Sequence, residues 1–118
     1  MVSLMELELA RKTLREDPEN FWALRQVAKY YLNEDYFRQA QSLYTQVVAI
    51  SPRILPEVLL DYEQKIEKDP DRIGPRLSLA GFALTIGEVD LAILELEEVI
   101  DIAPECVEAY NALGKIYV

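Results

Sequence analysis

Residues 69–104 read DPDRIGPRLSLAGFALTIGEVDLAILELEEVIDIAP, and residues 17–52 read DPENFWALRQVAKYYLNEDYFRQAQSLYTQVVAISP. Both segments open with Asp-Pro and close with a proline, and the opening and closing prolines are equally far apart in each segment. Alignment of the two segments on their first prolines places Ala28 on Ala80. A proline period of about 34 residues is typical of helix–turn–helix repeats that stack into a solenoid. We therefore predict an all-α fold that contains a duplicated helical unit.

The prolines divide the chain into helices, because proline disfavours a helical residue before it and cannot continue a helix. Pro18, Pro52, Pro70 and Pro104 each follow one stretch with apolar residues at helical spacing and precede another. The expected helices span residues 4–16, 19–33, 36–50, 55–68, 73–85, 88–102, and a seventh segment from about 106 onwards. Gly87 is expected to close the fifth helix as a left-handed cap. No segment shows the alternating pattern of a strand.

The charge distribution disfavours nucleic acid as a partner. The 118 residues carry a net charge of −9, whereas phosphate binding requires a basic face. Residues 88–108 contain eight acidic and no basic side chains, and residues 21–53 contain four basic and two acidic ones. Such charges commonly form a solvated face, and the alternative is that they steer a charged partner toward the protein.

The single cysteine, Cys106, excludes a disulfide within the chain and favours a reducing compartment, so we expect a cytoplasmic protein. No run of about 18 apolar residues predicts a membrane span. The amphipathic, acidic segment Met1–Ala10 is unlike a signal peptide.

The repeated segments resemble the tetratricopeptide repeat (TPR) family, whose pattern is W-x2-L-G-x2-Y, then A-x3-F, then P. The segment Tyr110-x2-Leu113-Gly114-x2-Tyr117 fills the first-helix motif. Residues 21–52 and 73–104 match as complete repeats, and residues 107–118 match the first helix of a further, truncated repeat. The resemblance implies that residues 1–118 form a single domain, a right-handed α-solenoid of antiparallel helix pairs. It also implies that the small residues Ala28, Ala80 and Gly114 lie where the helices of a pair approach closely.

Helix 55–68 departs from the family pattern, because the interval between Pro52 and Pro70 leaves room for a single helix only. Its residues Val58 and Tyr62 resemble second-helix positions. The extra helix leaves two alternatives: a kink in the superhelix, or a shift in the parity with which helices pair. We expect an atypical, kinked array.

The resemblance also implies a partner-binding groove, because the first helices of TPR arrays line a concave surface that binds peptides. The corresponding residues are Trp22, Arg25, Lys29, Asn33, Leu77, Gly81, Asn111 and Lys115. Arg25 and Lys29 lie one turn apart and resemble part of the carboxylate clamp of chaperone-binding members. We expect that reversing both charges weakens the binding of an acidic peptide and leaves folding intact. Gly81 is expected to let a ligand backbone approach closely.

Catalysis, cofactors and metal sites are not expected. The chain contains no histidine, so it lacks the usual general base and an imidazole ligand. Cys106 has acidic neighbours and is interpreted as an incidental thiol. The carboxylates of Glu95, Glu97, Glu98 and Asp101 are expected on the solvent face, and no phosphate- or dinucleotide-binding glycine motif occurs.

Two functions follow from these observations. The first is a non-enzymatic interaction module or scaffold that binds a peptide or partner protein in its groove. The alternative is a self-associating assembly protein, because residues 107–118 are expected to leave an apolar face partly open, formed by Val107, Tyr110, Leu113 and Tyr117. A mass in solution that depends on concentration would favour the homo-oligomer.

Overall fold

The computed structural model describes residues 2–118, and within them the chain forms seven α-helices, one short 3₁₀ turn and no strand. The helices are α1 (Leu4–Glu16), α2 (Phe21–Asn33), α3 (Phe37–Ile50), α4 (Leu55–Lys68), α5 (Ile73–Ile86), α6 (Val89–Ile102) and α7 (Val107–Tyr117), with the 3₁₀ turn η1 (Pro52–Ile54) before α4. This confirms the predicted all-α chain and its seven helices, each of which begins and ends within about two residues of the expected position.

Local sequence explains where several helices begin and end. The Ser3 side chain accepts a hydrogen bond from the Glu6 amide, and the Asn20 side chain accepts one from the Ala23 amide, so both residues act as N-caps. Gly87 has φ +86° and closes α5 in the left-handed conformation, as predicted. Asp35 occupies the same conformation after α2, with φ +68°, which aspartate tolerates better than most side chains.

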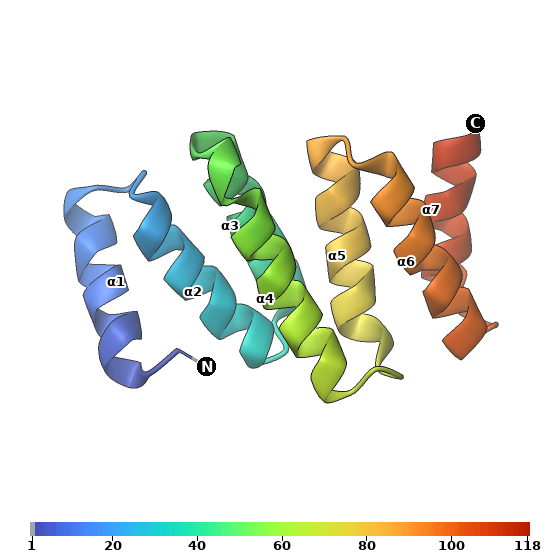
Figure 1. Ribbon diagram of the computed structural model, residues 1–118, viewed down its shortest axis with the longest axis horizontal. Coiled ribbons are helices and arrows are strands. Elements are labelled where there is room, and N and C mark those ends of the chain that lie inside the picture. Colours follow the sequence, from blue (N-terminus) through green and yellow to red (C-terminus); the bar gives the residue numbers. More distant parts are fainter. Residues whose placement is uncertain (1) are drawn as a thin grey trace.

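The helices follow one another along the 43 Å longest axis of the molecule, from α1 at one end to α7 at the other (Figure 1). The most extensive contacts join α2 with α3 and α5 with α6. Helix α3 also packs directly against α5, although α4 separates them in sequence. Helix α4 packs against α2 and α5, and in Figure 1 it lies in front of α3.

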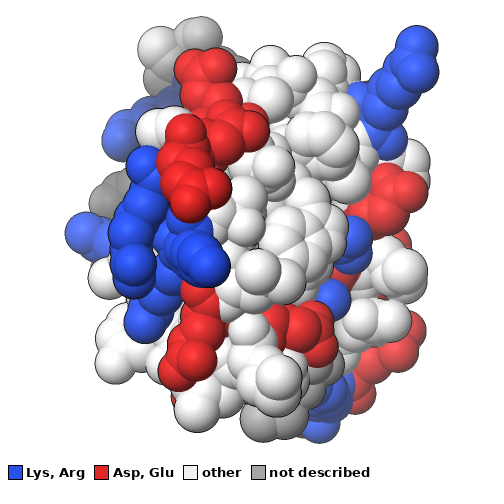
Figure 2. All heavy atoms as spheres, turned by 90° about the vertical axis from the view of Figure 1, so that its left-hand side faces the viewer, with Lys and Arg blue, Asp and Glu red and all other residues white. Residues whose placement is uncertain are grey.

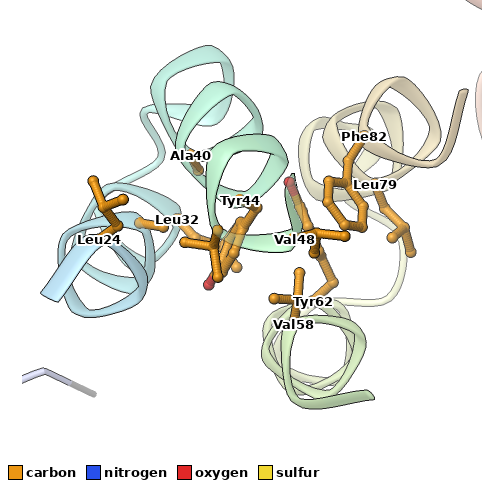
Figure 3. Packing of buried hydrophobic residues seen from close by; sticks show 11 residues of the cluster. Leu24, Leu32, Ala40, Tyr44, Val48, Val58, Tyr62, Leu79 and Phe82 are labelled. Carbon is orange, nitrogen blue, oxygen red and sulfur yellow. The ribbon is translucent and has the colours of Figure 1, made fainter. Parts of the chain in front are cut away.

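The central core is built around three aromatic rings that contact one another and come from three different helices. Tyr44 of α3, Tyr62 of α4 and Phe82 of α5 are fully buried, and their ring centroids lie 5.2 to 6.4 Å apart. Such edge and tilted aromatic contacts add to the free energy gained by burying the apolar surface. In Figure 3, α3 and α5 lie on one side of this cluster, and α2 and α4 lie on the other.

First and second helices of regular repeats alternate between the two sides of the array. The extra helix α4 moves every later helix to the opposite side. The first helix of residues 21–52, which is α2, lies beside α4, whereas the first helix of residues 73–104, which is α5, lies beside α3. Two smaller apolar clusters extend the core toward the ends: one joins α1 to α2, and the other joins α5, α6 and α7. This shift decides which of the predicted site residues can lie on the same face.

Candidate functional site

The α2 side of the core is closed by a buried ion pair. Arg25 of α2 donates from Nε to Asp61 Oδ2 at 3.0 Å and from Nη2 to Asp61 Oδ1 at 2.9 Å. Tyr44 donates its hydroxyl to the same carboxylate at 3.1 Å. The Asp61 side chain is only 3% exposed, and its hydrogen bonds to Arg25 raise the pKa of the arginine. The planar fork of the guanidinium matches the carboxylate, so this pair fixes α4 against α2.

A second set of ion pairs holds the C-terminal part of α4 against the turns that follow α2 and α4. The Asp35 carboxylate accepts from Lys65 Nζ and from Arg72 Nη1, each at 2.9 Å. Lys65 also donates to the backbone carbonyl of Asn33 at 3.2 Å, and the Arg72 guanidinium lies 5.3 Å from the centroid of the Phe37 ring. Hydrogen bonding to Lys65, and then to Arg72, holds the pKa of Asp35 below its ordinary value.

A hydroxyl chain links α4 to the α3 and α5 side. Ser78 of α5 donates its single proton to the Phe37 carbonyl at 3.0 Å, so the Tyr62 hydroxyl must donate to Ser78 Oγ, 2.8 Å away. Burial raises the pKa of Tyr62 and of Tyr44 well above the ordinary phenol value. Both phenols therefore stay neutral and act as structural donors.

The face on the other side of the core is open. Helices α3, α5 and α7 border a groove with a volume of about 950 Å³. Its lining comprises Asp35, Tyr36, Phe37, Arg38, Gln39, Gln41, Ser42, Thr45 and Gln46 from α3 and the turn before it, Gly74, Leu77, Ser78, Ala80, Gly81, Leu84 and Thr85 from α5, Leu96 from α6, and Glu108 and Ala112 from α7. Amides and hydroxyls of α3 thus face an apolar floor made mainly by α5.

Gly81 lines the groove, and the absence of a Cβ there also leaves room for a side chain of α3. A Cβ added there would lie 2.5 Å from the Gln41 side-chain amide, so Gly81 gives room to a side chain of α3. Within residues 2–118, the side chains of Gln41 and Gln46 make no hydrogen bond to the protein. Their amides are available to a ligand in the groove, and Gln41 can move without loss of a protein contact of this kind.

The structure divides the predicted site residues between two faces. Leu77 and Gly81 line the groove, whereas Lys29 and Asn33 line a pocket of about 390 Å³ between α2 and α4. Trp22, which is exposed, lies near the start of α2. Asn111 and Lys115 are also exposed, and they lie on α7 at helical spacing from the groove residues Glu108 and Ala112. The eight residues therefore do not form one continuous surface.

The expectation that reversing the charges of Arg25 and Lys29 leaves folding intact conflicts with the ion pair that Arg25 makes in the structure. Its guanidinium is engaged with Asp61, so a glutamate at this position would place one carboxylate against another. Like charges at this separation, partly shielded from water, destabilise the folded state. Reversing Arg25 would thus test the fold before it tests binding.

Sequence reasoning missed Asp61 and Lys65, which hold α4 in place. A signal was present: both residues lie on the apolar stripe of α4 that is formed by Val58, Tyr62 and Ile66, at spacings of three and four residues. A charged residue on an apolar stripe indicates a buried partner. Gln41 and Thr45 were missed because α3 was expected to lie away from the groove.

The sequence pattern predicts that the acidic side chains of α6 all lie on the solvent face, and this prediction is wrong for one of them. Glu95 is buried and accepts a hydrogen bond from Arg76 Nη1 at 3.0 Å, while Glu97, Glu98 and Asp101 are exposed. Within residues 2–118, no group of three or more Cys, Asp or Glu side chains is placed to hold a metal ion. None of the described helices has the length and apolar composition needed to cross a membrane.

Comparison with models of protein families and with curated protein sequences found no significant match.

Proposed function

We propose that this protein is a non-enzymatic interaction module of the TPR type, a right-handed α-solenoid of antiparallel helix pairs that works as a scaffold in the cytoplasm. Its groove between α3, α5 and α7 binds an extended segment of a partner protein. The single free thiol, Cys106, favours a reducing compartment. The regular proline period and the absence of histidine from the sequence favour a binding role over catalysis.

One observation carries the proposal: the open groove combines uncommitted amides with an apolar floor. An extended peptide exposes backbone N–H and C=O groups that Gln41 and Gln46 can pair with, and its side chains can pack on Leu77 and Leu84. The pocket between α2 and α4 offers less, because Asp61 and Lys65, which line it, already pair within the protein.

The experiment selects peptides from a random twelve-residue library and maps the bound peptide by amide chemical shifts. We expect the shifted amides on α3, α5 and α7, near Gln41, Gly81 and Ala112. The variant Ser42→Trp places a large side chain in the groove from an exposed position and should weaken binding about tenfold, which corresponds to about 1.4 kcal/mol.

The matched control is Glu63→Trp, which adds the same side chain at an exposed position of α4 on the other side of the core. It should bind the selected peptides within about twofold of the original chain. Peptides that shift amides of α2 and α4, or an equal loss in both variants, would contradict the groove assignment.

A further inference from the structure

Helix α7 exposes a stripe of apolar residues along its outer face. Val107, Tyr110, Gly114 and Tyr117 follow one another at spacings of three and four residues, so they lie on the same face. The three large side chains are each more than half exposed, with Tyr117 at 70%. A Cβ added at Gly114 would meet nothing within 4 Å, so the stripe has an open notch near its centre.

The two earlier helix pairs show what kind of element fits this stripe. Gly114 corresponds to Ala80 one period earlier in α5, and to Ala28 in α2. Ala80 is 1% exposed and Ala28 is fully buried, because α6 covers α5 and α3 covers α2 in the two most extensive helix contacts. The structure thus repeats one arrangement, in which a helix lies over the small residue. The occupant expected on α7 is an α-helix.

Helix α1 is the element with the complementary open face. Helix α1 ends before Pro18 in the same way that α3 ends before Pro52 and α6 before Pro104. It therefore has the position in the repeat that a second helix has. Whereas α3 and α6 pack extensively against helices on two sides, α1 packs extensively against α2 alone. On its open side, Met5 is 81% exposed and Leu9 is more than half exposed.

Figure 2 views the molecule from this end, and uncharged atoms fill the middle of the face with basic and acidic groups along its margins. The exposed apolar side chains of α1 are Leu4, Met5 and Leu9, so this face combines apolar side chains with charged ones, as docking surfaces do. Exposed apolar side chains that gather on one face beside charged ones indicate an interaction site.

The charges on α1 and α7 are complementary when the two helices run antiparallel. The exposed charges are Glu105 and Glu108 at the start of α7, Lys115 near its end, Glu6 and Glu8 in the first half of α1, and Arg11, Lys12 and Arg15 in its second half. Antiparallel pairing brings the acidic start of α7 to the basic half of α1, and Lys115 to the acidic half. Glu16 and Asp17 partly offset the basic half, so the apolar stripe supplies most of the contact.

We propose that the α7 stripe of one copy docks the open face of α1 of a second copy, so that the two helices complete a pair like α2 with α3. The contact joins two different surfaces and is therefore head-to-tail. Such contacts produce rings where the rotation closes and open chains where it does not. This self-association is separate from the peptide groove, which uses α3, α5 and the opposite edge of α7.

The test uses the full chain and two variants, each of which blocks one surface. Gly114→Arg fills the notch on α7, and Met5→Arg places a charge on the open face of α1; both positions are exposed, so neither change should disturb folding. Ala49→Arg, at an exposed position of α3, is the matched control. Circular dichroism checks that every variant is folded, and light scattering measures mass from micromolar to millimolar concentration.

We expect the original chain and the control to exceed the 13.6 kDa of one chain as concentration rises, and each blocked variant to remain at that mass. A mixture of the two blocked variants should form a species of twice that mass and no larger. The unblocked α7 stripe of Met5→Arg can dock the unblocked α1 face of Gly114→Arg, and the blocked surfaces at the two ends of this dimer prevent further growth. A constant monomer mass for the original chain overturns the proposal. So does a dimer of Met5→Arg alone, which would indicate contact between two α7 stripes.

Discussion

The two sides of the central core use polar side chains for opposite purposes. On the α2 and α4 side, Arg25, Asp61, Lys65 and Asp35 pair with one another and hold α4 in place. On the α3 and α5 side, side chains such as Gln41 face an open groove. Residue type alone therefore does not distinguish the polar side chains that are free to bind a ligand from those that hold the fold together. The separation depends on whether a neighbouring helix covers them, and α4 covers only one side.

Position in the chain explains the same difference. Both α2 and α5 begin a proline-bounded repeat, yet α2 lies with α4 on one side of the aromatic core and α5 lies with α3 on the other. Arg25 of α2 is therefore partly shielded from solvent and paired with Asp61 of α4, since a buried charge without a partner is costly. Small residues on α5 serve instead to bring α3 close.

Removing Asp61 should have the largest effect, because it breaks the closed side at its centre. Asp61→Ala leaves the Arg25 guanidinium and the Tyr44 hydroxyl without their shared acceptor. Loss of one member of a buried ion pair costs about 3 kcal/mol. Urea unfolding followed by circular dichroism should show that loss in the free energy of unfolding.

The control for this prediction is Asp71→Ala, which removes an exposed carboxylate in the loop before α5. It should change stability by less than about 0.5 kcal/mol. Equal costs for the two variants would mean that the ion pair contributes nothing beyond an exposed charge, and that α4 is held by Val58 and Tyr62 alone.

Two glycines of α5 differ in what a Cβ would meet on the open side of the core. A Cβ at Gly74 would collide with the Phe37 ring, which also packs under Arg72, whereas a Cβ at Gly81 would meet only the free end of Gln41. Gly74→Ala should therefore destabilise the protein by about 1–2 kcal/mol through overpacking. Gly81→Ala should stabilise it by about 0.5 kcal/mol, because alanine favours a helix more than glycine does.

Thermal unfolding of both glycine variants provides the measurement. The two stability changes are expected to have opposite signs. That difference tests whether the contact between α3 and α5 is rigid at Phe37 and adaptable at Gln41. A loss of stability in Gly81→Ala as large as that in Gly74→Ala would show that Gln41 is held in place and is not free to meet a ligand.

The helices could be predicted from sequence, because the information that sets them is local. Proline spacing, the apolar period and the cap at Gly87 each act within a few residues. The burial of Ala28 and Ala80 also follows from the repeat, since small residues recur where helices cross. Gly114 has the same place in the motif and is exposed, because none of the described helices covers the face of α7 on which it lies.

The site could be predicted only in part, because it depends on which helices become neighbours. The contact between α3 and α5 relies on the fit of Phe37 to Gly74 and of Tyr44 to Phe82, which no period in the sequence encodes. The expected list of first-helix residues therefore combined Lys29 on one side with Leu77 on the other.

Asp35 lies at the edge between the two sides, and its substitution is expected to have a small effect. Asp35→Asn keeps a residue that tolerates the left-handed backbone but removes the charge that faces Lys65 and Arg72. The carboxylate is partly exposed and screened by solvent, so we expect a cost of about 0.5 kcal/mol at neutral pH. Urea unfolding of both chains at several pH values is the measurement.

The pH dependence of the stability difference between the two chains distinguishes an effect of the Asp35 charge from an effect of the side-chain geometry. Because Lys65 and Arg72 lower the pKa of Asp35 in the folded state, its contribution is complete above the unfolded value of about 4 and disappears as the pH falls through the folded pKa. The original chain and Asp35→Asn should therefore differ at pH 7 and converge at about pH 2. A difference that persists unchanged at low pH would show that the turn depends on the geometry of the side chain, and that the ion pairs at this edge do not help to close the α4 side.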